Sequence, residues 1–524
     1  MGTLTEDISH TRRKLNYGLL AAIIHTAITF GTDAFIFDRI DMGNPAYVLK
    51  VTDYFTGKLI VFAALLAFYS FIFRLIKNRQ DKRISDDWRI LHAGLCYLPV
   101  IAVVAALKLP QGFLTNDETA IFNNAITFTH DTWFNIMTTY YYIASLMIIP
   151  VKYGPIIVKM IIEFFVVGYT VFRFRRHFKN KWANLSYLLF CLYPVVAYTT
   201  SAHRLPVYFL LYLLMMCKFV FDAMENEPLS RGARLGMLFL GAVLTQWRTE
   251  GIYLAVLVPI LMFTVYKELR NAKQLLVTIV LSLLLQVLLW IPQNGLFSDV
   301  DGAANDRMKP FYAYTITNMM RQGLDRSKNA DDLDVVDRYL SIEAIDAINE
   351  HYGDINYEDV LILYQEGFVG VREGASVEDF VNYSDALKRI FVNNPDCFLR
   401  TRIGAFGYAA VPYHLISYEG GIKSVLMCIF AAAKSFLYNL FIPFGIIIVL
   451  LIVSLFKKHW VEFFICGGVL CHWFIVFILA PASYFKYYFP MYIMAYFFVI
   501  LIVVRAISHL LNRRTRDIVQ EDAS

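Results

Sequence analysis

The stretch that decides the fold is LGMLFLGAVLTQWRTEGIYLAVLVPILMFTVY, residues 235–266. It is apolar throughout except for a polar break near its centre, Gln246–Gly251. Basic residues flank both ends, Arg231 and Arg234 before the stretch and Lys267 after it. Because Lys and Arg concentrate at the cytoplasmic ends of membrane segments, both ends are expected on the cytoplasmic side. The pattern therefore predicts a hairpin of two short helices, with its polar tip at or beyond the middle of the bilayer.

The composition of the whole chain supports a membrane location. Of its 524 residues, 58% are hydrophobic, 16% are aromatic and only 17% are charged. A soluble globular protein has about 45–50% apolar and about 25% charged residues. These values exclude a soluble enzyme and a disordered chain, and they predict an all-α polytopic membrane protein.

Apolar runs and their basic flanks predict about twelve transmembrane helices, with both termini in the cytoplasm. The expected spans are 15–36, 58–76, 91–109, 155–174, 185–200, 206–222, the two arms of 235–266, 275–290, 438–456, 460–479 and 488–504. The apolar run 133–149 is expected to lie against the membrane surface in an outer loop. Counting it as a span would place the basic residues of 173–181 outside the cell.

Charge is distributed unevenly along the chain. The segment 297–420 contains 21 acidic and 11 basic residues, a formal charge of −10, whereas the remainder carries +15. The basic excess lies in loops that flank the membrane, so nucleic acid is not an expected partner. Helical apolar spacing within 297–420 predicts a small, mostly helical insertion on the outer face. The expected organisation is an N-terminal transmembrane region 1–293 with a catalytic outer loop at 110–154, an extracytoplasmic domain 294–423, C-terminal transmembrane helices 424–510 and a cytoplasmic tail 511–524.

Four polar residues of the outer loop are candidate catalytic or binding groups. Asp117 and Glu118 directly follow a predicted span, and a carboxylate there can accept the proton of an attacking hydroxyl. Two solvated charges at a helix end would give the same pattern. Further along the loop, His130 and Asp131 could bind a metal or a sugar, although Asp131 could equally cap a surface helix.

Ionisable residues within the membrane segments form a second group. Arg248 and Glu250 lie at the tip of the predicted hairpin, where charge is costly and usually functional. An ion pair with neighbouring helices is the structural alternative. Lys159 and Glu163 are four residues apart in one span, so they can pair with each other.

Three basic residues are predicted at helix ends near the outer surface, His203, Arg204 and Lys486. Such cations can hold a lipid phosphate and stabilise it as a leaving group. Simple contact with lipid headgroups is the other interpretation.

Three short motifs resemble the GT-C superfamily of integral-membrane glycosyltransferases, over roughly residues 91–504. The first is the acidic pair in Asn116-Asp117-Glu118. The second, GAVLTQWRTEG over Gly241–Gly251, is similar to the Gly-x-x-Leu-Thr-Lys break of protein O-mannosyltransferase-like members. The third, FKYYFP over Phe485–Pro490, is similar to their Arg-Tyr-x-x-Pro motif.

The resemblance implies inverting transfer of a sugar from a polyprenyl-phosphate donor to a glycan, lipid or protein acceptor of the cell envelope, on the outer face of the cell membrane. Asp117 would be the base, with Glu118 as the alternative. The residues implied in substrate binding are His130, Asp131, His203, Arg204, Arg248, Glu250 and Lys486. Some members of the superfamily also use a divalent cation such as Mg²⁺ or Mn²⁺, and this sequence leaves the metal undecided.

Two other functions are compatible with the sequence. A transporter or flippase of lipid-linked sugars would use Lys159, Glu163, Arg248 and Glu250 along its route, although no internal repeat typical of transporters is visible. A non-catalytic assembly protein would use the outer insertion to bind a partner.

Overall fold

The computed structural model describes residues 17–80, 85–108, 116–130, 134–199, 204–292, 308–351, 363, 370–411, 421–480 and 483–521. These ranges contain helices and no β-strand; the only strand-like pairing in them is an isolated bridge between Leu340 and Val371. Nine segments in the same ranges are long and apolar enough to cross a bilayer: Tyr17–Phe35, Tyr47–Asn78, Asp86–Leu107, Gly154–Phe178, Leu205–Glu225, Ala272–Ile291, Ala431–Phe456, Trp460–Leu479 and Phe485–Arg513. The protein is therefore an all-α, multi-pass membrane protein.

Three segments predicted as spans are shorter than a full membrane crossing. The predicted span 185–200 is broken into α7 (Tyr187–Cys191) and α8 (Tyr193–Thr199). Pro194 lies in the first turn of α8, and it has no N–H group to continue the hydrogen-bond ladder of α7. The other two are the arms of the hairpin, which the sequence itself predicts to be short.

The chain forms two compact units. Unit 1 contains α1 (Tyr17–Thr32), η1 (Asp33–Phe35), α2 (Tyr47–Gln80), α3 (Asp86–Lys108), α4 (Asn116–Thr127), α5 (Ile136–Ile148) and the first part of α6 (Gly154–Phe178). Helices α3 and α6 approach closely at Gly168. A methyl group added to this glycine would lie only 2.5 Å from the carbonyl oxygen of Ile90. Small residues of this kind let membrane helices pack backbone to backbone. With 13 residues, α5 is too short to span a bilayer.

Unit 2 contains the end of α6 and the remaining helices. Its membrane part consists of η3 (Lys181–Ser186), α7, α8, α9 (Leu205–Glu225), α10 (Arg231–Trp247), η4 (Thr249–Tyr253), α11 (Leu254–Val265), η5 (Lys267–Leu269), α12 (Ala272–Ile291), α20 (Gly421–Leu437), α21 (Phe441–Phe456), α22 (Trp460–Leu479), η7 (Phe485–Tyr488) and α23 (Phe489–Glu521).

Helix α9 lies at the centre of unit 2, and most of its residues are buried. Phe209 near its start stacks on Phe489 at the start of α23, with ring centroids 3.9 Å apart. Further along, Phe221 contacts Phe497. The two helices therefore run in the same direction, and the start of α9 marks the same end of unit 2 as Lys486.

The predicted hairpin is present as α10, η4 and α11. Near its open end, the hydroxyl of Tyr266 contacts Met237 Sδ at 3.5 Å. Halfway along, the backbone of Gly241 lies against Val258 of the other arm. At the tip, a methyl group on Gly251 would lie 2.6 Å from the carbonyl oxygen of Leu244. The arms are therefore packed side by side, and Arg248 marks the end of the first arm.

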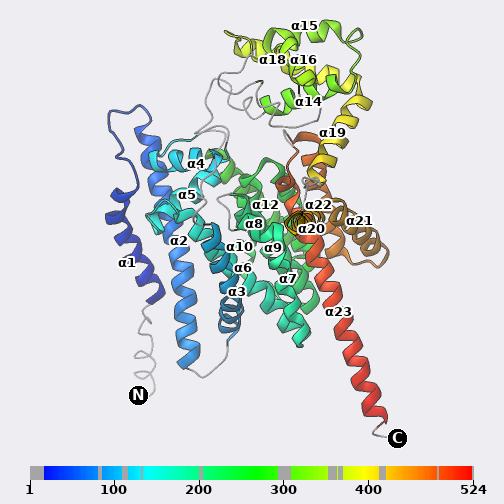
Figure 1. The fold of residues 1–524 in the computed structure, drawn as a ribbon. Helices are drawn as coiled ribbons and strands as arrows, with labels where there is room; N and C mark the ends of the chain where they lie inside the picture. Colours follow the sequence, from blue (N-terminus) through cyan, green and yellow to red (C-terminus); the bar gives the residue numbers. More distant parts are fainter. Residues whose placement is uncertain are drawn as a thin grey trace. The chain divides into compact units, whose positions relative to one another are not determined.

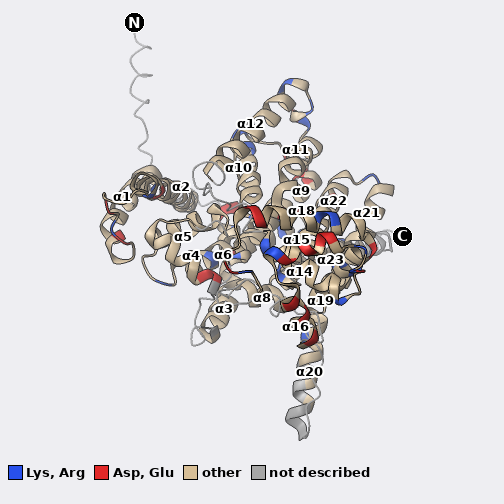
Figure 2. Cartoon of the chain, turned by 90° about the horizontal axis from the view of Figure 1, so that it is seen from above, with Lys and Arg blue, Asp and Glu red and all other residues tan. Residues whose placement is uncertain are grey.

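A helical insertion extends from the membrane part of unit 2, as the sequence predicts for this region. It comprises α14 (Lys309–Arg321), α15 (Ala330–Tyr339), α16 (Ile342–His351), α18 (Val377–Asn393) and α19 (Pro395–Ala410). Its core surrounds α14, whose residues Pro310–Met320 are all buried. In Figure 2, where the ribbon is coloured by residue type, the helices of the insertion carry red and blue segments, whereas α9–α11 are mainly tan.

Within unit 2, the insertion and the C-terminal end of α23 lie at opposite ends (Figure 1). Which side is cytoplasmic, and the exact domain boundaries, stay predictions.

Candidate functional site

Two of the predicted phosphate-binding cations meet at one tyrosine ring in unit 2. Arg248 follows the last residue of α10, and Lys486 lies in η7. The guanidinium carbon of Arg248 is 5.5 Å from the centre of the Tyr487 ring, and Lys486 Nζ is 5.9 Å from the same centre. Lys486 Nζ also lies 4.8 Å from the ring of Tyr484. The tip of the hairpin and the start of α23 are thus brought together by their basic and aromatic side chains.

Arg204 is linked to the same region. It precedes the first residue of α9, and its guanidinium carbon lies 4.8 Å from the centre of the Phe134 ring. The neighbouring Asn135 donates from Nδ2 to the carbonyl oxygen of Trp247 at 2.8 Å. Trp247 directly precedes Arg248, so these contacts connect Arg204 to the hairpin tip. Arg204, Arg248 and Lys486 are called the cation cluster below.

One carboxylate and one imidazole accompany the cation cluster. Glu250 forms an ion pair with Arg248, and both side chains are mostly buried. His472 of α22 is buried and bonds through Nε2 to the carbonyl oxygen of Tyr487 at 3.0 Å. The imidazole also interacts electrostatically with Glu250. Two cations on one tyrosine ring, with a carboxylate beside them, are chemically suited to a phosphate joined to an apolar group.

In unit 1, the adjacent acids Asp117 and Glu118 have different surroundings. Both lie in the first turn of α4, where the helix dipole favours negative charge. Glu118 is fully buried and interacts electrostatically with Lys159 of α6, which also interacts with Glu163. Asp117 is exposed. Neighbouring residues on a helix point about 100° apart, so only one of the two can face the packed interior.

His130 lies beyond the other end of α4, and that end, Thr127, is about 15 Å along the helix from Asp117. Its Nε2 bonds to Asp53 Oδ2 at 2.7 Å, and Tyr140 donates its hydroxyl to Asp53 Oδ1 at 2.9 Å. The structure therefore brings His130 to Asp53 of α2 and not to Asp117. The predicted site residues Asp131 and His203 lie outside the described residues.

A metal site is not formed by the residues for which positions are given. Among them, no three His, Cys, Asp or Glu side chains are grouped closely enough to bind a metal ion.

Several polar residues that the sequence analysis missed are buried in membrane helices. Asp53 and His472 belong to this group, as does Lys58, whose Nζ lies 2.6 Å from Asp33 Oδ2. Each is an ionisable residue within or at the edge of an apolar run, which is the signal that identified Arg248. Tyr487 has no such signal, because tyrosine is common in this sequence.

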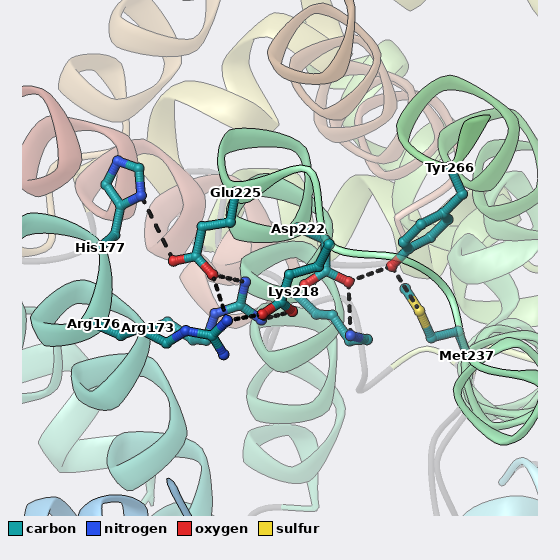
Figure 3. Close-up of polar contacts among 9 residues, drawn as sticks. Arg173, Arg176, His177, Lys218, Asp222, Glu225, Met237 and Tyr266 are labelled. Carbon is teal, nitrogen blue, oxygen red and sulfur yellow. Dashed lines mark hydrogen bonds and ion pairs between the residues drawn. The ribbon is translucent and has the colours of Figure 1, made fainter. Parts of the chain in front are cut away.

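A second network of charges lies at the opposite end of α9 (Figure 3). Asp222 accepts hydrogen bonds from Arg173 at 2.8 Å, Lys218 at 2.7 Å and the hydroxyl of Tyr266 at 2.5 Å. Glu225 lies 3.2 Å from Arg173 and also near Arg176 and His177. Here the cations form ion pairs with carboxylates of the chain. This network therefore connects the ends of α6, α9 and α11 and serves to stabilise the fold.

Comparison of the chain with protein-family models, with curated proteins and with solved structures finds no match.

Proposed function

We propose that the protein is a membrane glycosyltransferase that moves a sugar from a polyprenyl-phosphate donor to a cell-envelope glycan, lipid or protein acceptor, with inversion at the anomeric carbon. The observation that carries the proposal is the meeting of Arg248 and Lys486 at Tyr487. Both residues belong to segments that resemble GT-C motifs, and the fold joins the two segments. A pair of cations beside an aromatic ring supports binding of a lipid-linked phosphate.

In the proposed reaction, the acceptor hydroxyl attacks the anomeric carbon while the bond from that carbon to the phosphate oxygen breaks. The hydroxyl proton passes to a general base, the role that the resemblance gives to Asp117, and the electron pair of the broken bond stays on the phosphate. Arg204, Arg248 and Lys486 stabilise the negative charge of the departing phosphate. A phosphate is already a good leaving group, so one base and several cations suffice.

The exposure of Asp117 supports its role as the base, because an acceptor can reach an exposed carboxylate. Glu118 is buried beside Lys159 and is better suited to holding α4 on α6. The structure thus favours the first of the two acids that the sequence offers.

The test is sugar transfer by the purified protein in lipid nanodiscs, with a panel of polyprenyl-phosphate sugars and cell-envelope acceptors, in the presence of Mg²⁺, Mn²⁺ or EDTA. We expect Asp117→Asn to lower the rate about 10²- to 10⁴-fold. Asp86→Asn is the matched control, because Asp86 is also an exposed acid in the first turn of a helix. Full activity of Asp117→Asn would refute its assignment as the base.

A second candidate, transport of lipid-linked sugars, is favoured by the buried charges of unit 1. Lys159, Glu163 and Glu118 are all buried in or beside α6. In a transporter these groups would be essential and Asp117 would not. Uptake of a labelled lipid-linked sugar into vesicles, lost in Glu163→Gln and retained in Asp117→Asn, would support transport over transfer.

A further inference from the structure

The insertion makes a buried contact with the end of α22. Arg402 of α19 is 1% exposed. Its Nε donates to the carbonyl oxygen of Phe477 and its Nη2 to that of Ala480, both at 2.7 Å. Phe477 lies in the last turn of α22 and Ala480 is the capping residue that follows it, so no helical N–H is left to bind these carbonyls and the helix dipole favours a cation. Arg402 therefore fixes the point at which the chain leaves α22.

The surroundings of Arg402 are otherwise aromatic. The guanidinium carbon lies 5.6 Å from the centre of the Phe311 ring and 5.9 Å from that of Tyr314. Within the part of the chain that the structure describes, Arg402 forms no ion pair. Burial lowers the pKa of Arg402, but its ordinary value is so high that the group stays charged. A buried charge without a carboxylate is costly, so its two hydrogen bonds to α22 must compensate for much of that cost.

The segment after α22 is held by the insertion at a second place. The hydroxyls of Tyr314 and Ser483 are hydrogen-bonded to each other. Tyr484 and Tyr487 pack against the core of the insertion. From the membrane side, His472 bonds to the carbonyl oxygen of Tyr487. The segment that carries Lys486 is thus held between the insertion and α22.

We infer that Arg402 is a positioning residue, through which the insertion holds Lys486 and Tyr487 in the geometry that binds the donor phosphate. The inference rests on the proposed function for the role of the cation cluster. It assigns to the insertion a task in the reaction, in which Arg402 acts through the backbone of Phe477 and Ala480 and touches no substrate. The insertion then fixes the distance between Lys486 and Arg248.

Hydrogen–deuterium exchange of the full chain in nanodiscs tests the inference without any assay of activity. We expect Arg402→Gln to raise amide exchange over residues 483–488 about tenfold or more, because it loses the charge-assisted hydrogen bonds to α22. Arg402→Lys should give an intermediate increase, since one ammonium cannot replace the guanidinium fork. Tyr314→Phe, a mild change that leaves Arg402 intact, should raise exchange in the same segment by a few-fold.

Arg400→Gln is the matched control, because Arg400 is an exposed arginine of the same helix that pairs with Asp396. It should leave exchange over 483–488 unchanged. The donor KM should rise about tenfold in Arg402→Gln while kcat changes little, as expected for a residue that positions a binding group.

Unchanged exchange over 483–488 in both Arg402→Gln and Tyr314→Phe would overturn the inference, whatever the activity. An equal rise of exchange throughout α14–α19 and α22 would also overturn it, because it would show general destabilisation. If exchange rises locally but the wild type transfers no sugar, the positioning contact stands and the proposed function fails.

Discussion

Arg248 and Lys486 lie against the same aromatic ring, at 5.5 and 5.9 Å from the centre of Tyr487. One comes from the tip of a membrane hairpin and the other from the turn before α23. Two cations in water repel each other, and bringing them together in a poorly hydrated region costs more. The partial neutralisation of Arg248 by Glu250 and the electron-rich ring offset this repulsion. A bound phosphate would offset the remainder.

The first prediction is that Arg248→Gln and Lys486→Gln each weaken binding of a polyprenyl-phosphate sugar about 10- to 100-fold, because each removes a charge-assisted contact to phosphate. The double variant Arg248→Gln/Lys486→Gln should lose less binding free energy than the sum of the two single losses, since both cations bind one phosphate. Binding is measured by titration of a labelled donor into purified protein, with Arg231→Gln as the exposed control from the start of α10. If Arg248 served only to neutralise Glu250, the double variant Arg248→Gln/Glu250→Gln would bind donor like the wild type.

The second prediction separates the adjacent acids of α4. Glu118→Gln should destabilise the folded protein by about 1–3 kcal/mol, because Lys159 would lose one of its two carboxylate neighbours in a buried site. Asp117→Asn should leave stability within about 0.5 kcal/mol and impair catalysis. Unfolding in mixed micelles, followed by tryptophan fluorescence, gives the first quantity, and transfer per folded protein gives the second. A reversed pattern would assign the base to Glu118.

The hairpin and the membrane class were predicted from the sequence because both depend on long runs of apolar residues and on the charges that flank them. The break at Gln246–Gly251 and the basic flanks of 235–266 are visible without any tertiary information. The span expected over 185–200 was wrong as a single helix, because one proline outweighed an apolar run of sufficient length.

The candidate site was only partly predictable. Arg248 and Lys486 were found as unusual charges near membrane helices, whereas their meeting at Tyr487 depends on how η4 and α11 pack beside α22, which itself packs beside α23. The pairing of His130 with Asp53 was missed because the two residues are far apart in sequence and neither occurs in a recognisable motif. The burial of Glu118 was likewise invisible, since an Asp-Glu pair at a helix start carries no information about which side chain faces inward.

The third prediction concerns the contact between α2 and the region after α4. Asp53 is fully buried and accepts from both His130 and Tyr140. We expect Tyr140→Phe to cost about 1–2 kcal/mol of stability and Asp53→Asn about 2–3 kcal/mol, measured by unfolding in micelles. Their effects should add incompletely, because both variants alter the same contact between residues 53 and 140. Thr52→Ala, at an exposed position of the same turn, should change stability by less than about 0.5 kcal/mol; a loss equal to that of Asp53→Asn would contradict the proposed contact.

The fourth prediction addresses the charge network at the far end of α9 (Figure 3). Asp222→Asn should destabilise the protein by about 3 kcal/mol, because it leaves the buried Arg173 and its neighbour Lys218 without their shared carboxylate. Tyr266→Phe should cost about 1–2 kcal/mol. Glu227→Gln, at a more exposed carboxylate of the network, should cost at most about 1 kcal/mol. Donor affinity of the folded fraction should be unchanged in all three, and a selective loss of binding in Asp222→Asn would show that the network belongs to the site.

The last prediction concerns the sides of the membrane. The last turn of α6 carries Arg175 and Arg176, at the end of unit 2 that contains the Asp222 network. The acidic insertion lies at the other end of unit 2 (Figure 1). We therefore expect the insertion outside the cell and these basic residues in the cytoplasm. A cysteine at the exposed Ser327 should react with an impermeant maleimide in intact cells, whereas one at the exposed Lys181 should react only after permeabilisation. The native cysteines give the background, which is subtracted by labelling the parent chain in parallel. The opposite labelling pattern would invert the orientation, and because polyprenyl-phosphate sugars are then required on the cytoplasmic side, it would also move the proposed transfer reaction to the inner face.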